Sequence, residues 1–533
     1  MRKLLFLFLT GVLISMSSCR NDFEFEPSTG GLEFSKDTVY LDTVFTNIGS
    51  STYRLKVYNR SDKDISIPQV KLQKGITSKY RIMVDGMTGD AGAEGKIFSN
   101  VELLAKDSLY IFIEVTADVA SANPTDFLYT DKIEFTNIVG APQDVDLVTL
   151  IQDAYFIYPQ RTGTTGNFLY EAVNLGVGDD GDNVVIAGSN LDEFDPVNGN
   201  EYFWNNTKPY VVYGYAFVPD GKTLTVNPGA RVHFHANSGL IVGKNAVLKI
   251  NGAVSSTAAL ENEVIFEGDR LEPLYTDVPG QWGAIINYST SSANEINHLT
   301  LKNATVGILN GNLATTTNTV DFPKLTIKNT QIYNCSNLGI LARKSNVDGE
   351  NIVINYCGQA SFAGTFGGSY NFTHCTFNNN WSSSSQLAVL LNNYFETETT
   401  IYVHDLDQAN FNNCIIYGSN QVEMLLDYEP EGATDFNYKF NHCLIRFNNI
   451  NNQFTTNPLY QFSTDAVHYN NCTITTNSVT NKPKYEDLNN NKLWLTEDLN
   501  LPSDPIFTAL VPLDILGINR TNSTDLGAYQ FVP

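Results

Sequence analysis

A six-residue segment recurs through the second half of the chain and constrains the fold more than any other feature. Each copy has an apolar residue first, a small residue or cysteine fourth and, in most copies, an apolar residue sixth. Self-similarity of this kind predicts stacked turns in which equivalent side chains meet. The copies are LKNATV (301–306), IKNTQI (327–332), FTHCTF (372–377), FNNCII (411–416), FNHCLI (440–445) and YNNCTI (469–474), with INYC (354–357) as a weaker seventh.

The fourth position of the repeat predicts the packing inside the stack. Successive fourth residues are 26, 27, 18, 39, 29 and 29 positions apart, lengths that suit one coil of a parallel β-helix with loops inserted in some turns. Rungs about 4.8 Å apart would stack five cysteines as small apolar residues. Disulfides between adjacent rungs remain an alternative at that spacing. The fourth residues are Ala304, Thr330, Cys357, Cys375, Cys414, Cys443 and Cys472.

The third position alternates between Asn and His. Polar residues at tight bends tolerate the left-handed conformation and can bond to neighbouring amides. We therefore interpret this position as a corner of each coil. His374 and His442 would be catalytic only with a convergent carboxylate or hydroxyl, and no local motif suggests one.

The first half of the chain has a different pattern. Between residues 32 and 158, short bursts alternate apolar and polar residues, as in 53–58 and 109–115, separated by Asn, Asp, Gly and Ser. This period of two predicts a β-sandwich. Residues 159–208 form a predicted connector and N-terminal cap.

Several motifs resemble a known family. The glycine-punctuated strands of 221–268 resemble the first coils of the right-handed parallel β-helix repeat family. GDRLE (268–272) and PGQWG (279–283) resemble its Bacteroidota lipoprotein branch. The resemblance implies an all-β chain, with a right-handed parallel β-helix over 209–510. A C-terminal cap would follow over 511–533, where DILGINR and DLGAY resemble a closing coil. VYNRS (57–61) resembles the start of an immunoglobulin-like domain, which would occupy 32–158 as a spacer.

The N-terminus resembles a bacterial lipoprotein signal. A basic start and an apolar run over 4–14 precede two small residues and Cys19, although Met16 stands where such motifs usually carry Leu. The run is shorter than a membrane span. The resemblance implies that residues 1–18 are removed and that Cys19 is acylated, with 19–31 as a tether. The alternative is a soluble secreted protein with an incidental cysteine.

The residues after Cys19 resemble the acidic export signal of Bacteroidota surface lipoproteins. Asn21, Asp22, Phe23 and Glu24 make up that signal. The implied location is the outer membrane, lipid-anchored and exposed at the cell surface. Acidic tethers also serve solubility alone.

Charge limits the partners. The 33 basic and 57 acidic residues give a net charge of −24, which repels nucleic acid and disfavours polyanionic substrates unless calcium bridges them. We expect no cofactor. Calcium is an alternative at two oxygen-rich turns, although neither has the spacing of a calcium loop and solvated turns are the preferred interpretation. The turns contain Asp179, Asp180, Asp182 and Asn183, and Asp192, Asp195, Asn198 and Asn200.

Asp269, Arg270 and Trp282 belong to the densest polar and aromatic cluster and are the candidate contacts for a ligand or partner. The alternative is a loop pinned to the stack by an Asp–Arg pair and a half-buried indole. The repeated segments lack the paired carboxylates of a polysaccharide hydrolase. We therefore expect a non-catalytic surface lipoprotein, an interaction or scaffold module such as an accessory subunit of an outer-membrane β-barrel complex. The alternative is a polysaccharide-binding or polysaccharide-cleaving protein, a lyase or hydrolase.

Overall fold

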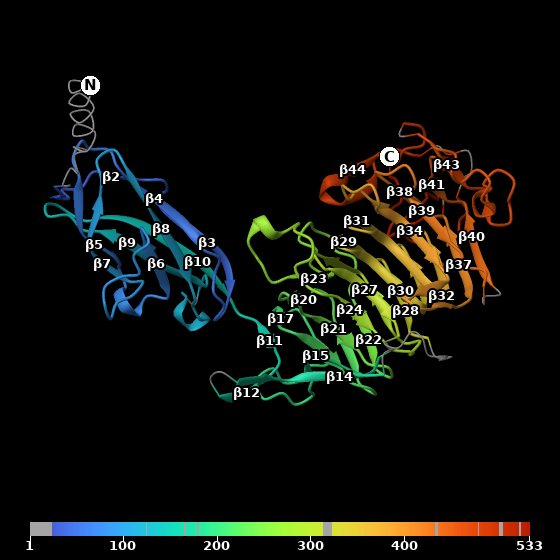
Figure 1. Cartoon of the computed structure of the whole chain (residues 1–533), viewed down its shortest axis with the longest axis horizontal. Coiled ribbons are helices and arrows are strands. Elements are labelled where there is room, and N and C mark those ends of the chain that lie inside the picture. Colours follow the sequence, from blue (N-terminus) through green and yellow to red (C-terminus); the bar gives the residue numbers. More distant parts are fainter. Residues whose placement is uncertain are drawn as a thin grey trace, which may run out of the picture. The chain divides into compact units, whose positions relative to one another are not determined.

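The computed structural model describes residues 24–123, 125–164, 167–178, 181–312, 322–431, 435–477, 479–499, 501, 505–521 and 524–532. The chain is all-β, with 49% of residues in strands and 3% in helices. It divides between Asp153 and Ala154 into two compact units, and Figure 1 labels many of their strands. Within the described part of the chain, no helix combines the length and apolar character needed to span a membrane.

Two sheets form the first unit and enclose one core. One sheet has the order β2-β4-β8-β6, and the other β1-β5-β9-β10-β3 with β7 also paired to β5. The expected alternation is confirmed in β8, where Leu109, Ile111 and Ile113 are buried while Tyr110 and Phe112 are exposed. The strands are β1 Glu26–Pro27, β2 Leu32–Phe34, β3 Thr38–Phe45, β4 Tyr53–Asn59, β5 Ile65–Leu72, β6 Tyr80–Val84, β7 Ile97–Leu103, β8 Ser108–Val115, β9 Leu128–Phe135 and β10 Gln143–Gln152.

The second unit is built from parallel strands stacked coil upon coil. An 11-stranded sheet, entirely parallel, faces an 18-stranded sheet across one continuous apolar core (Figure 1). Apart from the antiparallel pair β14–β15, the strands pair in parallel with strands of the neighbouring coils, so the chain winds through both sheets. The 11-stranded sheet contains β11 Tyr155–Ile157, β17 Tyr210–Val212, β20 Arg231–Phe234, β23 Val264–Gly268, β26 Leu299–Lys302, β29 Gln331–Cys335, β31 Val353–Cys357, β33 Thr376–Asn379, β38 Ile415–Gly418, β41 Leu444–Arg446 and β43 Thr473–Thr475.

The longer sheet carries the remaining coil strands. They are β14 Ala172–Val177, β15 Asn183–Asn190, β16 Phe203–Trp204, β18 Tyr215–Val218, β19 Thr223–Val226, β21 Gly239–Val242, β22 Val247–Asn251, β24 Ile285–Asn287, β25 Glu295–Asn297, β27 Val306–Gly311, β28 Lys324–Lys328, β30 Leu338–Glu350, β32 Ala360–Thr373, β34 Leu387–Asn392, β37 Leu406–Asn412, β39 Met424–Asp427, β40 Phe436–Asn441 and β42 Tyr469–Asn470.

Three hairpins lie outside the two sheets, and short 3₁₀ turns complete the described secondary structure. The hairpins are β12 Arg161–Thr164 with β13 Asn167–Tyr170, β35 Tyr394–Glu396 with β36 Ile401–Val403, and β44 Tyr485–Asp487 with β45 Lys492–Leu495. The 3₁₀ turns are Gly75–Thr77, Val119–Ser121, Pro273–Tyr275, Pro458–Tyr460 and Leu488–Asn490.

Left-handed corners connect the two sheets, as the third position of the repeat predicted. The strand pairing shows that two copies, LKNATV and INYC, do not align with the others as the sequence suggested. Leu301 and Ile354 stand first in these copies, but both pair with Ile332, which stands sixth in its own copy. There are therefore two corners: one joins the 18-stranded sheet to the 11-stranded sheet, and the other leaves the 11-stranded sheet. The first contains His298, Asn329, Asn351, His374, Asn413, His442 and Asn471, and the second Asn303, Asn334 and Tyr356, all with positive φ.

Because there are two corners, the cysteines also form two separate columns. Cys375, Cys414, Cys443 and Cys472 follow the first corner, whereas Cys357 lies beside Cys335 after the second. The expected column of five is therefore a column of four and a pair. All six thiols are free, so the adjacent-rung disulfides left open by the sequence are not formed.

The last part of the chain lies across the outer face of the 11-stranded sheet. Leu493, Ile515 and Tyr529 pack on Val353, and Leu526 packs on Ile415 and Leu444. Hydrogen bonds repeat along this contact: the Asn355 amide nitrogen donates to Asn491 Oδ1 over 2.8 Å, and Ala528 N donates to Thr376 Oγ1 over 3.1 Å. The stretch expected as a C-terminal cap, 511–533, thus packs along the side of the stack in its described residues.

Candidate functional site

One column of side chains runs the length of the outer face of the 11-stranded sheet. Alternate residues of a strand point to opposite faces, and the residues next to the buried Ile354, Phe377 and Ile445 point outward. Strand register brings these outward residues into a single line. From the N-terminal coils onward the column reads His233, Glu267, Lys302, Tyr333, Asn355, Asn378, Tyr417, Arg446 and Thr475.

In the early part of this column the charged side chains pair with one another. Lys302 Nζ lies 2.7 Å from one oxygen of Glu267, and His233 Nδ1 lies 3.7 Å from the other. Burial lowers the pKa of His233, although the Glu267 carboxylate beside it acts in the opposite direction. These groups bond mainly to each other, so they stabilise the sheet.

The later part of the column opens into a pocket of about 650 Å³. Asn378, Tyr417 and Arg446 form its floor on the sheet, and residues 482–485 and Leu488 of the C-terminal segment form a wall. This volume falls within the range of about 300–1,000 Å³ typical of small-molecule sites. The charged side chains of the lining are all cationic: Arg446, Lys482 and Lys484.

Arg446 is held in place from behind the pocket. Its Nε donates to Asn420 O over 3.3 Å and its Nη2 donates to Gln421 Oε1 over 2.9 Å. The guanidinium lies 6.0 Å from the centre of the Tyr417 ring, and only 3% of Arg446 is exposed. Among the described residues, Nη1 has no hydrogen-bond partner. A rigid, desolvated cation with an unused donor is suited to binding an oxyanion.

Glu423 lies next to this pocket, beneath the turn that begins at Gly418. A Cβ at Gly418 would collide with Glu423 Oε1 and with the carbonyl oxygen of Asn379, so this approach requires glycine. Asn420 N donates to Oε1 over 2.6 Å, whereas Oε2 has no partner among the described residues. Burial raises the pKa of Glu423 to about 8, and the charge of Arg446 opposes that shift only in part. Burial therefore favours the protonated form of Glu423.

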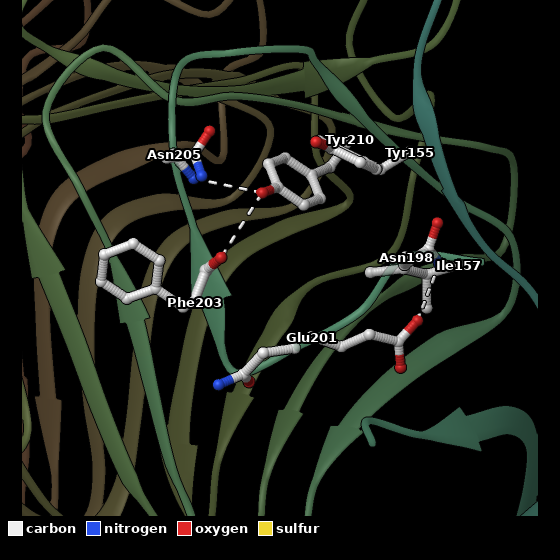
Figure 2. Close-up of a pocket in the computed structure, with 8 residues that line it drawn as sticks. Tyr155, Ile157, Asn198, Glu201, Phe203, Asn205 and Tyr210 are labelled. Carbon is white, nitrogen blue, oxygen red and sulfur yellow. Dashed lines mark hydrogen bonds between the residues drawn. The ribbon is translucent and has the colours of Figure 1, made fainter. Parts of the chain in front are cut away.

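A second pocket, of about 270 Å³, lies near the first coil of the second unit (Figure 2). Its polar groups bond to protein: Glu201 Oε1 accepts from the Asn198 side chain over 2.8 Å, and Tyr210 OH accepts from Asn205 N over 3.2 Å. Burial raises the pKa of Glu201. Because these groups are already paired, this pocket is the weaker candidate.

The contact residues predicted from sequence occupy a different place. Trp282 is 1% exposed, stacks on Phe234 at 4.3 Å and donates from its indole nitrogen to Lys302 O over 2.9 Å. The expectation that this indole contacts a ligand is therefore wrong, because the core of the stack covers it. Asp269 Oδ2 lies 2.7 Å from His235 Nδ1, and Arg270 bonds to Glu272 at 3.1 and 3.2 Å. Asp269 thus bonds to the residue that follows β20, one coil earlier, and Arg270 bonds within the loop that leaves β23.

The N-terminal signal falls largely beyond what the structure describes. Cys19, Asn21, Asp22 and Phe23 lie outside the described residues, and Glu24 is exposed. Acylation and export therefore remain predictions.

The carboxylates of the second oxygen-rich turn accept hydrogen bonds from backbone amides. Asp179 and Asp180 lie outside the described residues. Asp195 Oδ1 accepts from Val197 N and Asn198 N, and Asp192 Oδ1 accepts from Phe194 N, as in ordinary Asx turns. In the described ranges, no group of three or more His, Cys, Asp or Glu side chains is placed to hold a metal ion.

Sequence reasoning missed the pocket for a physical reason. Arg446 directly follows the copy FNHCLI, whereas Glu423 lies in a loop outside the repeated segment, and Lys482 and Lys484 lie beyond the last copy. One signal was available: within a chain of net charge −24, Lys482 and Lys484 fall two residues apart without an acidic neighbour between them.

Comparisons with known proteins add little. No family model matches this sequence, and no curated protein matches it. Among solved structures, a family 123 glycoside hydrolase from Clostridium perfringens is 9% identical over 24% of this chain and 30% of its own, with a TM-score of 0.16. A PapD-like domain of human CEP192 is 12% identical over 26% and 95%, with a TM-score of 0.16. A Bacteroides ovatus GH5 xyloglucanase in complex with a XXXG heptasaccharide is 10% identical over 62% and 72%, with a TM-score of 0.13. The chain thus spans less than a third of the first of these, and TM-scores so low carry no argument about fold or function.

Proposed function

We propose that this protein is a non-catalytic surface lipoprotein that binds a partner or glycan on the outer face of its parallel stack. In this proposal Cys19 is acylated and residues 21–24 direct export to the outer face of a Bacteroidota outer membrane. The first unit is an immunoglobulin-like β-sandwich that acts as a spacer. The second is a right-handed parallel β-helix, which presents the binding face as an interaction or scaffold module, for example as an accessory subunit of an outer-membrane β-barrel complex.

The pocket on the outer face is the observation that carries this proposal. Its floor comes from three successive coils, so hydrogen-bonded strands fix the positions of Asn378, Tyr417 and Arg446. Binding sites benefit from such pre-organisation because little conformational entropy is lost when the ligand arrives. A covalently attached lipid would keep the whole stack at the membrane surface.

Polysaccharide binding or cleavage, by a lyase or hydrolase, is the second candidate. Glu423 favours it, because a carboxyl that stays protonated at neutral pH suits a general acid. Hydrolysis would also require a second carboxylate about 5–10 Å away, and the charged groups in the pocket lining are cations. Glu423 itself is fully buried behind Gly418. Binding is therefore the better supported of the two activities.

A pull-down from native outer membranes in mild detergent tests the proposed function. The full-length tagged lipoprotein is compared with Cys19→Ala, and both membrane pelleting and co-purified proteins are measured. We expect the wild type to pellet with the outer membrane and to bring down a β-barrel protein in stoichiometric amounts, and Cys19→Ala to lose the membrane. Pelleting of Cys19→Ala as complete as the wild type would refute the anchor.

Recovery of the lipoprotein alone would contradict the accessory-subunit role. A polysaccharide binding and cleavage screen then separates the candidates, because release of reducing ends that Glu423→Gln abolishes would establish an enzyme.

A further inference from the structure

We propose that the outer-face pocket binds an anionic sugar, meaning a saccharide residue that carries a carboxylate or a sulfate ester. This inference rests on the proposed function, since it names the ligand class of the same pocket. The pocket is locally cationic in a protein whose net charge is −24, so the lining departs from the charge of the surrounding molecule.

The cationic groups converge on one volume. Arg446 rises from β41 on the floor, while Lys482 and Lys484 lie on the C-terminal segment that borders the same pocket. Lys484 Nζ pairs with Glu497 at 2.6 Å, but that carboxylate is 54% exposed, and water and salt weaken such a pair. An oxyanion bound between Arg446 and Lys482 would be opposed by no carboxylate of the lining.

An inorganic anion alone would not form hydrogen bonds with all of the buried polar atoms that border the pocket. Among the residues that the structure describes, Arg446 Nη1 is a buried donor without a partner, Asn378 Oδ1 is a buried acceptor without one, and the Tyr485 hydroxyl, which can serve as either, also has none. Leaving a buried polar group unpaired costs about 1–3 kcal/mol. An inorganic anion would satisfy the donor and leave Asn378 Oδ1 unpaired. A sugar acid supplies an oxyanion for Arg446 together with hydroxyl donors for Asn378.

Shape also favours a sugar. Tyr417 and Tyr485 border the pocket together with the side-chain amides of Asn378 and Asn380. Aromatic faces and amides provide an apolar surface beside hydrogen-bonding groups, the combination expected of a specific small-molecule site. Asn378 is oriented by the preceding rung, since its amide nitrogen donates to Asn355 Oδ1 over 2.9 Å.

Isothermal titration of the full-length lipoprotein in detergent, at low and high salt, tests the ligand class. The probes are glucuronate, glucose 6-sulfate, glucose and inorganic sulfate. We expect glucuronate or glucose 6-sulfate, or both, to bind more tightly than glucose and inorganic sulfate, with affinity falling as salt rises. Tighter binding of glucuronate would identify the anionic group as a carboxylate, and tighter binding of glucose 6-sulfate would identify it as a sulfate ester. Equal binding of glucose would refute the role of the cations, equal binding of inorganic sulfate would refute the sugar, and no binding would refute the proposal.

Variants localise the binding. Lys482→Gln changes an exposed side chain and should weaken binding by about two- to fivefold, the size expected for one exposed charge, whereas Lys439→Gln, on the exposed face of β40, should not change it. Arg446→Lys keeps the charge but loses the planar fork and should weaken binding further. If Arg446→Lys fails to fold, the affinity of Lys482→Gln still tests whether the anion binds in this pocket.

Unchanged affinity in Lys482→Gln would place the anion elsewhere and overturn the proposal. Membrane pelleting and the stoichiometric β-barrel partner of the pull-down are independent of these titrations. Failure of the ligand assignment is therefore distinguishable from failure of the proposed function.

Discussion

The side-chain amide nitrogen of Asn413 lies 3.1 Å from Nε2 of His374, one coil earlier in the stack. Both residues are in the left-handed conformation, at φ of 53°, so the hydrogen bond joins two consecutive corners. Asn471 repeats the contact with His442 at 3.2 Å. In the bond to His374 the ring nitrogen accepts, which requires a neutral imidazole. These histidines are corner residues, as the sequence predicted, and their chemistry is that of a structural acceptor.

Acid should destabilise the stack through His374. Burial lowers the pKa of His374 to about 3 from 6.5, so its contribution to stability is complete above pH 6.5 and is lost as pH falls towards 3. The slope in that window is about 1.4 kcal/mol per pH unit. Asparagine tolerates the left-handed conformation of the corner. We therefore expect His374→Asn to remove this contribution to the pH dependence of the unfolding free energy, measured by urea titration between pH 3 and 7. His404→Asn, outside the corner, is the control; an unchanged slope in His374→Asn would contradict the assignment.

The cysteine column should be inert in the folded protein. Burial raises the pKa of Cys414 and Cys443 well above its ordinary value, and a thiol that is neither exposed nor ionised reacts slowly. We expect maleimide labelling, mapped by peptide mass spectrometry, to leave both residues unmodified in native protein and to modify them fully in urea. Rapid native labelling of Cys414 would show that the column is not packed as described.

The C-terminal segment should stabilise the second unit by covering its outer face. Leu493 is 1% exposed and packs with Val353 and Tyr529. Leu493→Ala removes buried methyl groups and should lower the free energy of unfolding by about 2–5 kcal/mol. Lys492→Ala, at the exposed neighbouring position, should change it little. Equal stability of the two variants in denaturant titrations would mean that the segment is only loosely attached.

The sequence predicted the strands and the corner chemistry because both repeat. It misplaced Leu301 and Ile354 because the two corners look alike: each has a polar residue in the left-handed conformation followed by a small or apolar one. Only the pairing of Leu301 with Ile332 separates them. Residue spacing could not resolve this, since loops of different length interrupt the coils.

Other features were beyond the reach of local patterns. Trp282 appeared among charged neighbours in the sequence, but its ring packs on Phe234 from an earlier coil. The pocket depends on bringing Lys482 against β38 and β41, a contact between a segment without periodicity and strands that precede it. Sites made by such returning segments emerge only when the tertiary structure is known.

Glu423 should make the protein less stable as pH rises towards 8. Its pKa is raised by burial from 4.5 to about 8, so the native state binds a proton that the unfolded state has lost throughout that window. Stability therefore falls with increasing pH between those values, by about 1.4 kcal/mol per unit from this group. Deprotonation would leave a charge whose Oε2 has no partner among the described residues.

Glu423→Gln isolates this effect, because the amide keeps an oxygen for the bond from Asn420 N and cannot ionise. We expect the variant to match the wild type near pH 4 and to be more stable at pH 8, in urea titrations followed by fluorescence. Glu398→Gln, at an exposed hairpin position, should follow the wild type at both values. A variant less stable than the wild type at pH 8 would mean that the native carboxylate is charged and paired, and Arg446 would then be occupied by Glu423 and not be free for an external anion.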